Sequence, residues 1–130
     1  MDTKKKPFVL IVEDDKFLLD MYVMKFTEHG FTIDTAFGGQ EALDKLVKND
    51  VKPDIVLLDL VIPGLGGFKV LERIKKEKLI PKAFVVILSN LGQKEDVDRS
   101  MALGADGYIV KASATPTEVV NRVKAILEGK

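Results

Sequence analysis

The four-residue apolar run Ile55–Leu58 constrains the fold of this chain most, because it is bounded on both sides and ends at a charge. Pro53 precedes the run, and a Pro63-Gly64 turn follows it. The run is too short for a helix and contains no polar residue, which predicts a strand buried on both faces. Asp59 comes directly after this strand. Because ligands of open α/β sheets gather at the carboxyl ends of the strands, Asp59 is a candidate functional residue.

Four further strand-like segments alternate with amphipathic helical patterns along the chain. Phe8–Val12 and residues 83–88 are almost wholly apolar, residues 31–36 alternate apolar and polar positions, and Gly107–Val110 is short. Gly30 and Gly104 are expected to end two of the helices, and Thr115 to Glu118 form a capping-box signature before the last. Helices are expected over residues 17–26, 41–47, 67–78, 94–103 and from 116 to about 128.

This alternation predicts one α/β domain: a doubly wound (βα)5, flavodoxin-like fold with helices on both faces of a five-stranded parallel sheet. The most apolar strands belong in the centre, and the segments at 31–36 and Gly107–Val110 belong at the edges. The expected strand order is therefore 2-1-3-4-5, with the switch point between strands 1 and 3. The domain is expected to fill residues 1–130, with a core over about 8–128 and no output domain.

Composition narrows the class of protein. Hydrophobic residues make up 46% of the chain, which excludes a disordered protein, and the absence of cysteine excludes disulfides and thiolate metal sites. The 20 basic and 20 acidic residues balance, so we expect no direct nucleic-acid binding. The apolar run Phe8–Val12 is too short for a signal-peptide core and no run is long enough to span a membrane, so we expect no membrane insertion and a cytoplasmic location. The basic run at Lys4, Lys5 and Lys6 is interpreted as a solvated tail.

Three carboxylates are expected to meet at the switch point, because Glu13 and Asp14 follow strand 1 and Asp59 follows strand 3. Unpaired, they would repel one another, and a hard divalent cation would relieve the repulsion. Oxygen ligands without His or Cys favour Mg²⁺ over zinc or copper. His29, the only histidine, lies at the end of the first expected helix and is interpreted as structural.

Ser89 and Lys111 follow strands 4 and 5 and are expected on the same edge of the sheet. A hydroxyl and an ammonium beside a metal-binding carboxylate suit phosphoryl transfer, which depends on positioning and charge neutralisation.

Taken together, these residues and their spacing resemble the receiver domain of two-component response regulators, the chemotaxis-regulator-like fold. The resemblance covers Phe8 to about Glu128. The motifs that carry it are Val12-Glu13-Asp14-Asp15, Pro53-Asp54 through Asp59 with Ile62-Pro63-Gly64, Leu88-Ser89, and the stretch from Ala102 to Lys111.

The resemblance implies a role for each site residue. Asp59 would accept a phosphoryl group from a phosphohistidine, and Ser89 and Lys111 would hold its oxygens. Mg²⁺ would be bound by Asp14, Asp59 and the backbone carbonyl of Val61, with Glu13 acting through a metal-bound water. Tyr108 would swing inward as Ser89 moves toward the phosphate, and the face made by helix 4, strand 5 and helix 5 would change.

The resemblance also implies partners. A sensor histidine kinase or a histidine phosphotransfer protein would supply the phosphoryl group, and an unidentified downstream protein would receive the signal. The chain would be a monomer or a phosphorylation-dependent homodimer. It would be a phosphoacceptor that assists its own phosphorylation and dephosphorylation, rather than an enzyme.

Several positions depart from the pattern of the family. Ala112 stands where a proline in a cis peptide is common, and a cis bond before a non-proline residue costs about 3–4 kcal/mol, so a trans bond and a shifted loop are expected. Asn90 replaces a small residue and is expected to screen the site. Gly66 replaces an aspartate, so the third helix loses a capping carboxylate. Val61 has no polar group to orient a hydrolytic water, which predicts slow autodephosphorylation.

One expectation concerns the signalling face: helix 5 carries Val119 and Val120, and at least one of them is expected to be exposed.

Three alternatives remain open at this point. A haloacid-dehalogenase-like phosphatase would need a second acid at the position of Val61. A flavodoxin-like cofactor binder would need a phosphate loop rich in Ser, Thr and Gly, whereas the loop after strand 1 is acidic. A degenerate, phosphate-independent adaptor is disfavoured by the complete site, but the departures at Asn90 and Ala112 favour it.

Overall fold

The computed structural model describes residues 6–48 and 51–129. Within them, one parallel sheet has the predicted order β2-β1-β3-β4-β5. The strands are β1 (Phe8–Val12), β2 (Thr32–Ala36), β3 (Ile55–Leu58), β4 (Phe84–Ser89) and β5 (Gly107–Val110). The helices are α1 (Lys16–Glu28), α2 (Gly39–Val47), α3 (Gly67–Lys76), α4 (Lys94–Ala102) and α5 (Pro116–Glu128), with a short 3-10 helix η1 (Lys111–Ser113) before α5.

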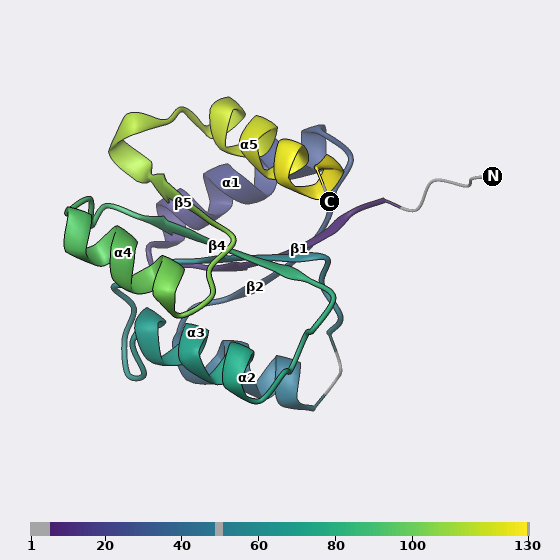
Figure 1. Cartoon of the computed structure of the whole chain (residues 1–130). Coiled ribbons are helices and arrows are strands. Elements are labelled where there is room, and N and C mark those ends of the chain that lie inside the picture. Colours follow the sequence, from purple (N-terminus) through teal and green to yellow (C-terminus); the bar gives the residue numbers. More distant parts are fainter. Residues whose placement is uncertain (1–5, 49–50, 130) are drawn as a thin grey trace.

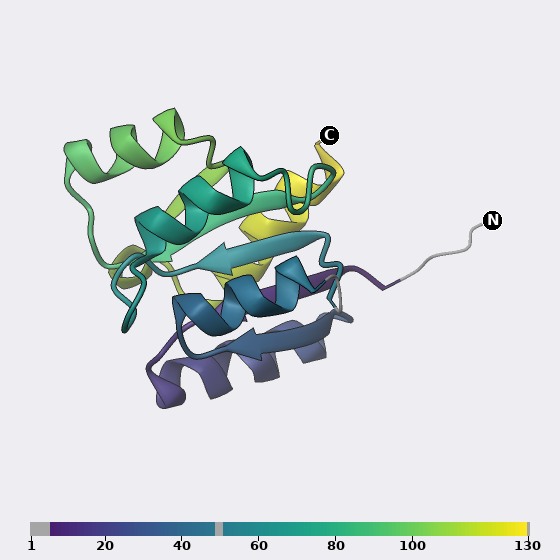
Figure 2. The same cartoon turned by 90° about the horizontal axis from the view of Figure 1, so that it is seen from below.

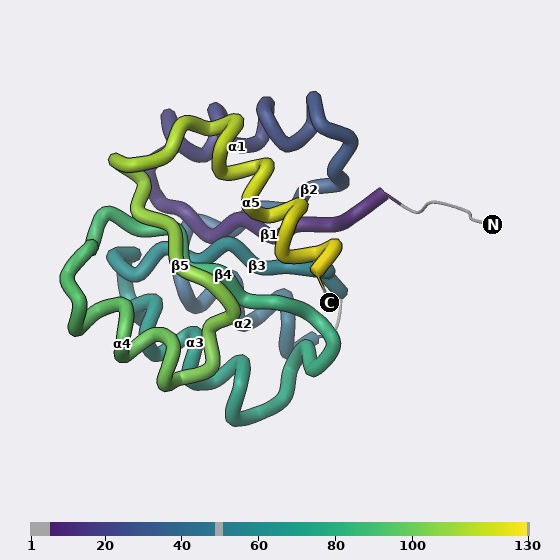
Figure 3. The backbone as a smooth tube through the Cα atoms, turned by 45° about the horizontal axis from the view of Figure 1, so that its top comes forward, coloured from purple at the N-terminus to yellow at the C-terminus, as the bar shows by residue number. Residues whose placement is uncertain are grey.

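Helices cover both faces of the sheet, as the alternation of patterns predicts. The helices α1 and α5 lie on one face, and α2 and α3 lie on the other (Figure 1). Seen from below, α2 and α3 cross in front of the strands, while α4 lies toward the β5 side (Figure 2). The order of the strands and the side-by-side packing of α1 and α5 can be followed in the backbone trace (Figure 3).

The central strands carry the core. In β1, Leu10 and Val12 join the apolar cluster beneath α2 and α3, whereas Val9 and Ile11 join the cluster beneath α1 and α5. All four residues of β3 are buried, since helices cover both of its faces and strands flank both of its edges. The edge strand β2 is only partly buried, as its alternating pattern predicts.

The strand register brings the carboxyl ends of β1 and β3 level with one another. Val12 pairs with Leu58, and Leu58 pairs with Ile87 of β4. The residue that follows each strand therefore emerges at the same edge of the sheet. This register is what places Glu13 beside Asp59.

Local signals set most helix ends. The capping box at Thr115 and Glu118 is present at the start of α5. Gly30 follows α1 with a φ of +87° and Gly104 follows α4 with a φ of +103°, conformations that glycine adopts without strain. The third helix ends at Lys76 rather than at 78, because Lys78 has a φ of +53° and has left the helical region.

The expectation that Val119 or Val120 is exposed is wrong. Val119 and Val120 are both completely buried, because α5 lies against both α1 and the sheet. On α1, Phe17 and Met24 fall at apolar helical spacing but are 78% and 61% exposed.

Three further features lie outside the core: the C-terminal end of α1, the N-terminal lysines and the character of the helices. His29 is the C-cap residue of α1, and its Nδ1 lies 3.3 Å from Nζ of Lys124, while Lys25 is a cation in the last turn of the helix. Of the basic run, Lys6 is exposed, and Lys4 and Lys5 lie outside the described residues. No helix in the described ranges combines the length and apolarity needed to cross a bilayer.

Candidate functional site

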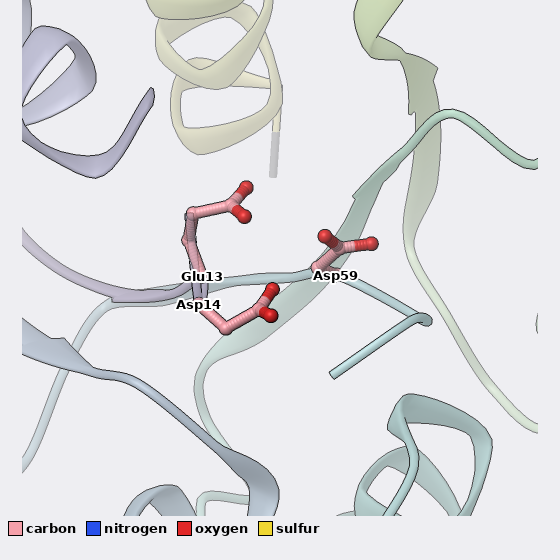
Figure 4. A group of neighbouring side chains, drawn as sticks. All are labelled: Glu13, Asp14 and Asp59. Carbon is pink, nitrogen blue, oxygen red and sulfur yellow. The ribbon is translucent and has the colours of Figure 1, made fainter. Parts of the chain in front are cut away.

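Three carboxylates converge where β1 and β3 end. One carboxylate oxygen from each of Glu13, Asp14 and Asp59 lies within 4.8 Å of the others. Glu13 and Asp14 follow β1, and their side chains point toward that of Asp59 (Figure 4). Glu13 and Asp59 are 2% and 6% exposed, whereas Asp14 is open to solvent. The sequence therefore predicted this cluster correctly.

Backbone hydrogen bonds hold two of the three residues in line with the sheet. The Glu13 N–H donates to the carbonyl of Ala36 at 3.0 Å, and the Asp59 N–H donates to the carbonyl of Val12 at 3.2 Å. The sheet ladder thus continues one residue beyond each strand. Because the backbone is held in this way, the two buried carboxylates have a defined position.

Lys111 neutralises part of this negative charge. Its Nζ lies 2.5 Å from Oε1 of Glu13 and 2.8 Å from Oδ2 of Asp59, and its side chain is 9% exposed. Burial lowers the pKa of Lys111, but hydrogen bonds to Asp59 and Glu13 outweigh it, so this pKa lies above its usual value. Burial raises the pKa of Glu13, and the contact with Lys111 only partly offsets that effect.

Ser89 and Tyr108 meet at the backbone of Leu91. Ser89 is completely buried, and its Oγ accepts a hydrogen bond of 3.2 Å from the Leu91 N–H. The half-buried Tyr108 donates its hydroxyl to the Leu91 carbonyl. Sequence reasoning singled out Ser89 and Tyr108 and missed Leu91, because an apolar residue that acts through its backbone leaves no signal in the sequence.

The loop after β3 shapes the position of Asp59. The Val61 N–H donates to Oδ1 of Asp59 at 3.2 Å, and the Val61 side chain is 61% exposed. The first turn of α3 packs against the backbone of Asp59, so closely that a Cβ on Gly67 would lie 2.3 Å from the Asp59 carbonyl oxygen. The N-cap residue Gly66 makes no side-chain cap, as expected from the missing carboxylate.

The predicted phosphorylation and metal-site residues border one cleft of about 420 Å³, whereas Tyr108, the predicted switch, does not line it. A larger cleft of about 690 Å³ lies at the other end of the strands, where they begin. Asp54 is the one carboxylate that lines it, and its Oδ2 accepts a hydrogen bond of 2.8 Å from the Phe8 N–H. Only the smaller cleft brings several carboxylates together with an ammonium and a hydroxyl. It is lined by Glu13, Asp14, Asp15, Leu18, Asp59, Val61, Ser89, Asn90, Leu91 and Lys111.

The peptide bond after Lys111 has the predicted conformation. The described residues contain no cis peptide bond, so the bond between Lys111 and Ala112 is trans, as expected. The chain continues into η1, which the sequence did not predict. The Ala112 N–H donates to Oδ1 of Asn90 at 2.9 Å.

The donor set suits a hard cation. The clustered side chains offer carboxylate oxygens and neither nitrogen nor sulfur, which is the chemistry that Mg²⁺ prefers. Two carboxylates of the three are buried, and the exposed Asp14 leaves the cluster open to solvent on one side. The residues present therefore fit Mg²⁺.

A parallel (βα)5 fold with an acidic cluster at its switch point, an ammonium and a hydroxyl defines a class of phosphoryl-accepting α/β domains. Residues 9–124 match the family described as the response regulator receiver domain. The chain belongs to this family, and it is a receiver domain of two-component response regulators.

Individual relatives agree with this assignment. The phosphate regulon transcriptional regulatory protein PhoB of Rhizobium meliloti is 32% identical over 93% of this chain, which covers 52% of that protein. The chain thus spans about half the length of the curated relatives it matches. The Francisella response regulator 1452 receiver domain is 30% identical, with a TM-score of 0.85 over 95% of this chain and 98% of that one.

A further solved structure is that of an activated receiver. The BeF3-activated receiver domain of DrrB, from Thermotoga maritima, is 27% identical to this chain. Its TM-score is 0.82, over 95% of this chain and 99% of that one.

Proposed function

We propose that Asp59 is the phosphoacceptor of this receiver domain. The observation that carries this proposal is its position: Asp59 directly follows the central strand β3, and its carboxylate shares one cleft with Glu13, Asp14 and Lys111. A carboxylate oxygen of Asp59 would form a bond to phosphorus as the phosphorus–nitrogen bond of a phosphohistidine breaks. The electron pair of that bond would return to the imidazole of the donor.

We propose that Asp14, Asp59 and the backbone carbonyl of Val61 hold Mg²⁺, with Glu13 acting through a bound water. Bound Mg²⁺ would offset the negative charge of the phosphoryl oxygens and of the carboxylates. The oxygen-only cluster supports this ligand set. Three acidic groups beside an incoming phosphoryl group would otherwise repel it.

Lys111 and Ser89 are proposed to hold the phosphoryl oxygens. Lys111 already contacts Asp59, so its ammonium lies beside the position where the new phosphoryl group would sit. Ser89 Oγ uses one acceptor position for the Leu91 N–H, which leaves its hydroxyl proton free to donate toward a phosphoryl oxygen. Both residues would thus bind the developing charge without contributing a nucleophile of their own.

The phosphoryl donor is proposed to be a protein, a sensor histidine kinase or a histidine phosphotransfer protein, that docks on α1. Phe17, Met21 and Met24 are spaced by four and three residues, which places them on one side of the helix. Phe17 and Met24 are largely exposed, and Leu18, the neighbour of Phe17, lines the phosphorylation cleft. An exposed apolar surface on the helix that borders the cleft suits a donor that must present its phosphohistidine to Asp59.

The output is proposed to pass through Tyr108 to the α4-β5-α5 face, where a downstream protein binds. Leu91 connects Ser89 to Tyr108 through its N–H and its carbonyl, so a shift of Ser89 toward a phosphoryl group would disturb both contacts. Ser100 is the only buried residue of α4, and its hydroxyl has no hydrogen-bond partner among the described residues. A helix anchored by so little burial can shift at low cost.

The remaining expectations stay predictions. The chain would accept one phosphoryl group on its own carboxylate rather than turn over a substrate, and Val61 leaves no second acid of the kind that a phosphatase needs. A cytoplasmic location, a monomer or phosphorylation-dependent homodimer, and the lack of direct nucleic-acid binding also remain to be tested. The last of these needs a direct measurement, since the relative PhoB is named a transcriptional regulator.

The test is labelling of the purified chain by acetyl phosphate in the presence of Mg²⁺, with intact mass and peptide mapping. The wild type should gain one phosphoryl group, and Asp59→Asn should gain none. Asp54→Asn is the matched control, because it alters a carboxylate at the opposite end of β3 and should leave labelling unchanged. A folded wild type that stays unlabelled would favour the phosphate-independent adaptor instead.

A further inference from the structure

Two residues that depart from the pattern of the family meet in this structure. Oδ1 of Asn90 accepts a hydrogen bond of 2.9 Å from the backbone N–H of Ala112. Asn90 directly follows Ser89, and Ala112 directly follows Lys111. The bond therefore joins the neighbours of the two side chains that are proposed to hold the phosphoryl oxygens.

This contact lies where the sheet ladder has ended. Ser89 opposite Val110 is the last pair of β4 and β5, and beyond it the two chains separate into the loop before α4 and into η1. Ala112 is the second residue of η1, a position whose N–H has no partner inside the helix. The Asn90 side chain supplies that partner and connects the two loops.

The Lys111 side chain ties the first residue of η1 to Glu13 and Asp59, but few hydrogen bonds hold the backbone of η1 itself. Its own backbone contact, from the Ala114 N–H to the Lys111 carbonyl, is 3.4 Å long, whereas the bond to Asn90 is 2.9 Å. Val110, which precedes the turn, makes no side-chain cap. The bond from Ala112 to Asn90 is thus the shorter of the two hydrogen bonds that fix the backbone beside Lys111.

The two departures depend on each other chemically. A proline at position 112 would have no N–H, so the Asn90 oxygen would have no donor there. Conversely, a small residue at position 90 would leave the Ala112 N–H without this acceptor. The hydrogen bond therefore requires both departures, a residue with an N–H at position 112 and a side-chain acceptor at position 90.

We propose that Asn90 is a positioning residue of the phosphorylation site. Its bond to Ala112 fixes the loop after β5 against the loop after β4, and so holds the Lys111 ammonium in register with Ser89 and Asp59. This inference rests on the proposed function. Asn90 and Ala112 are both exposed, so the contact can be removed without opening the core.

A double-mutant cycle tests the proposal, with Asn90→Ala, Ala112→Pro and the double variant. The initial rate of labelling by acetyl phosphate and Mg²⁺ is measured together with thermal unfolding and amide hydrogen exchange at residue 112. Asn90→Ala should slow labelling about tenfold, since a displaced catalytic group loses rate steeply, while the unfolding midpoint stays that of the wild type. Exchange of the Ala112 amide should become faster in this variant.

The double-mutant cycle separates the loss of the hydrogen bond between Ala112 and Asn90 from other effects of a proline at position 112. Asn90→Ala should have no further effect in the background of Ala112→Pro, because the bond is already absent there. Gln93→Ala is the matched control: it removes an exposed carboxamide from the same loop, one that makes no cap on α4, and labelling should stay at the wild-type rate.

The unfavourable outcomes are distinct. Labelling of Asn90→Ala at the wild-type rate, or an equal slowing by Asn90→Ala in both backgrounds, would overturn the inference and leave the proposed function standing. A wild-type chain that takes no phosphoryl group would overturn the proposed function, and the positioning role with it.

Discussion

The ammonium nitrogen of Lys111 lies 2.8 Å from Oδ2 of Asp59, although the two residues are 52 positions apart in the chain. The same nitrogen contacts Glu13, so one cation contacts two buried carboxylates that follow different strands. The acidic cluster is therefore partly neutralised by the protein itself. Removing the Lys111 ammonium should therefore lower the free energy of unfolding more in the absence of a metal ion than in its presence.

We predict that Lys111→Met lowers the free energy of unfolding by about 3 kcal/mol in EDTA, because two buried carboxylates lose their partner. Mg²⁺ should restore part of this loss, since a bound cation can take over the neutralisation. Denaturant unfolding with EDTA or Mg²⁺ measures both effects. Lys94→Met, which removes an exposed ion pair to Asp98, should cost less than about 1 kcal/mol. Equal losses in the two variants would contradict this prediction.

Gly67→Ala should destabilise the fold by about 1–3 kcal/mol, because its Cβ would overlap the backbone of Asp59 and Leu60. That Cβ would lie 2.3 Å from the Asp59 carbonyl oxygen, so labelling of Asp59 should also slow. In Gly66→Ala the added carbon would lie 3.9 Å from the Leu60 carbonyl oxygen, at a φ of −65°, and stability should be almost unchanged. Thermal unfolding of the two variants side by side gives the comparison, and similar midpoints would refute it.

Phe17→Ala should reduce phosphotransfer from a phosphohistidine protein about tenfold, since an exposed aromatic beside the cleft is a candidate docking contact. Labelling by acetyl phosphate, which needs no docking surface, should change much less. The measurement compares both donors on the same preparation. Val47→Ala serves as the control, because Val47 is 52% exposed at the end of α2. Loss of activity with both donors would argue against a docking role.

Val61→Asn should shorten the lifetime of the phosphorylated chain severalfold. The Val61 side chain borders the cleft and is 61% exposed, but it offers no polar group to orient an attacking water. Decay of the labelled protein after removal of acetyl phosphate gives the rate. Val61→Ala shortens the side chain without adding a polar group, so its decay should match the wild type; an Asn variant no faster than this control would count against the idea.

The loops and helix faces mark where sequence reasoning was incomplete. The trans bond at Ala112 was expected from the cost of the alternative, but its hydrogen bond to Asn90 was not, because the two residues lie 22 positions apart on different loops. Val119 and Val120 both proved buried, since α5 is covered by α1 as well as by the sheet. Phe17 proved exposed although it fits the apolar spacing of α1.

The sequence by itself determined the alternation of strands and helices, the order of the sheet and the convergence of Glu13, Asp14 and Asp59. These follow from local hydrophobic periodicity and from the rule that parallel strands end at one edge. Only the tertiary structure decided that Lys111 bridges Glu13 and Asp59 and that Leu91 links Ser89 to Tyr108. Such contacts depend on how loops from distant strands pack, and no local pattern encodes the distance between two loops.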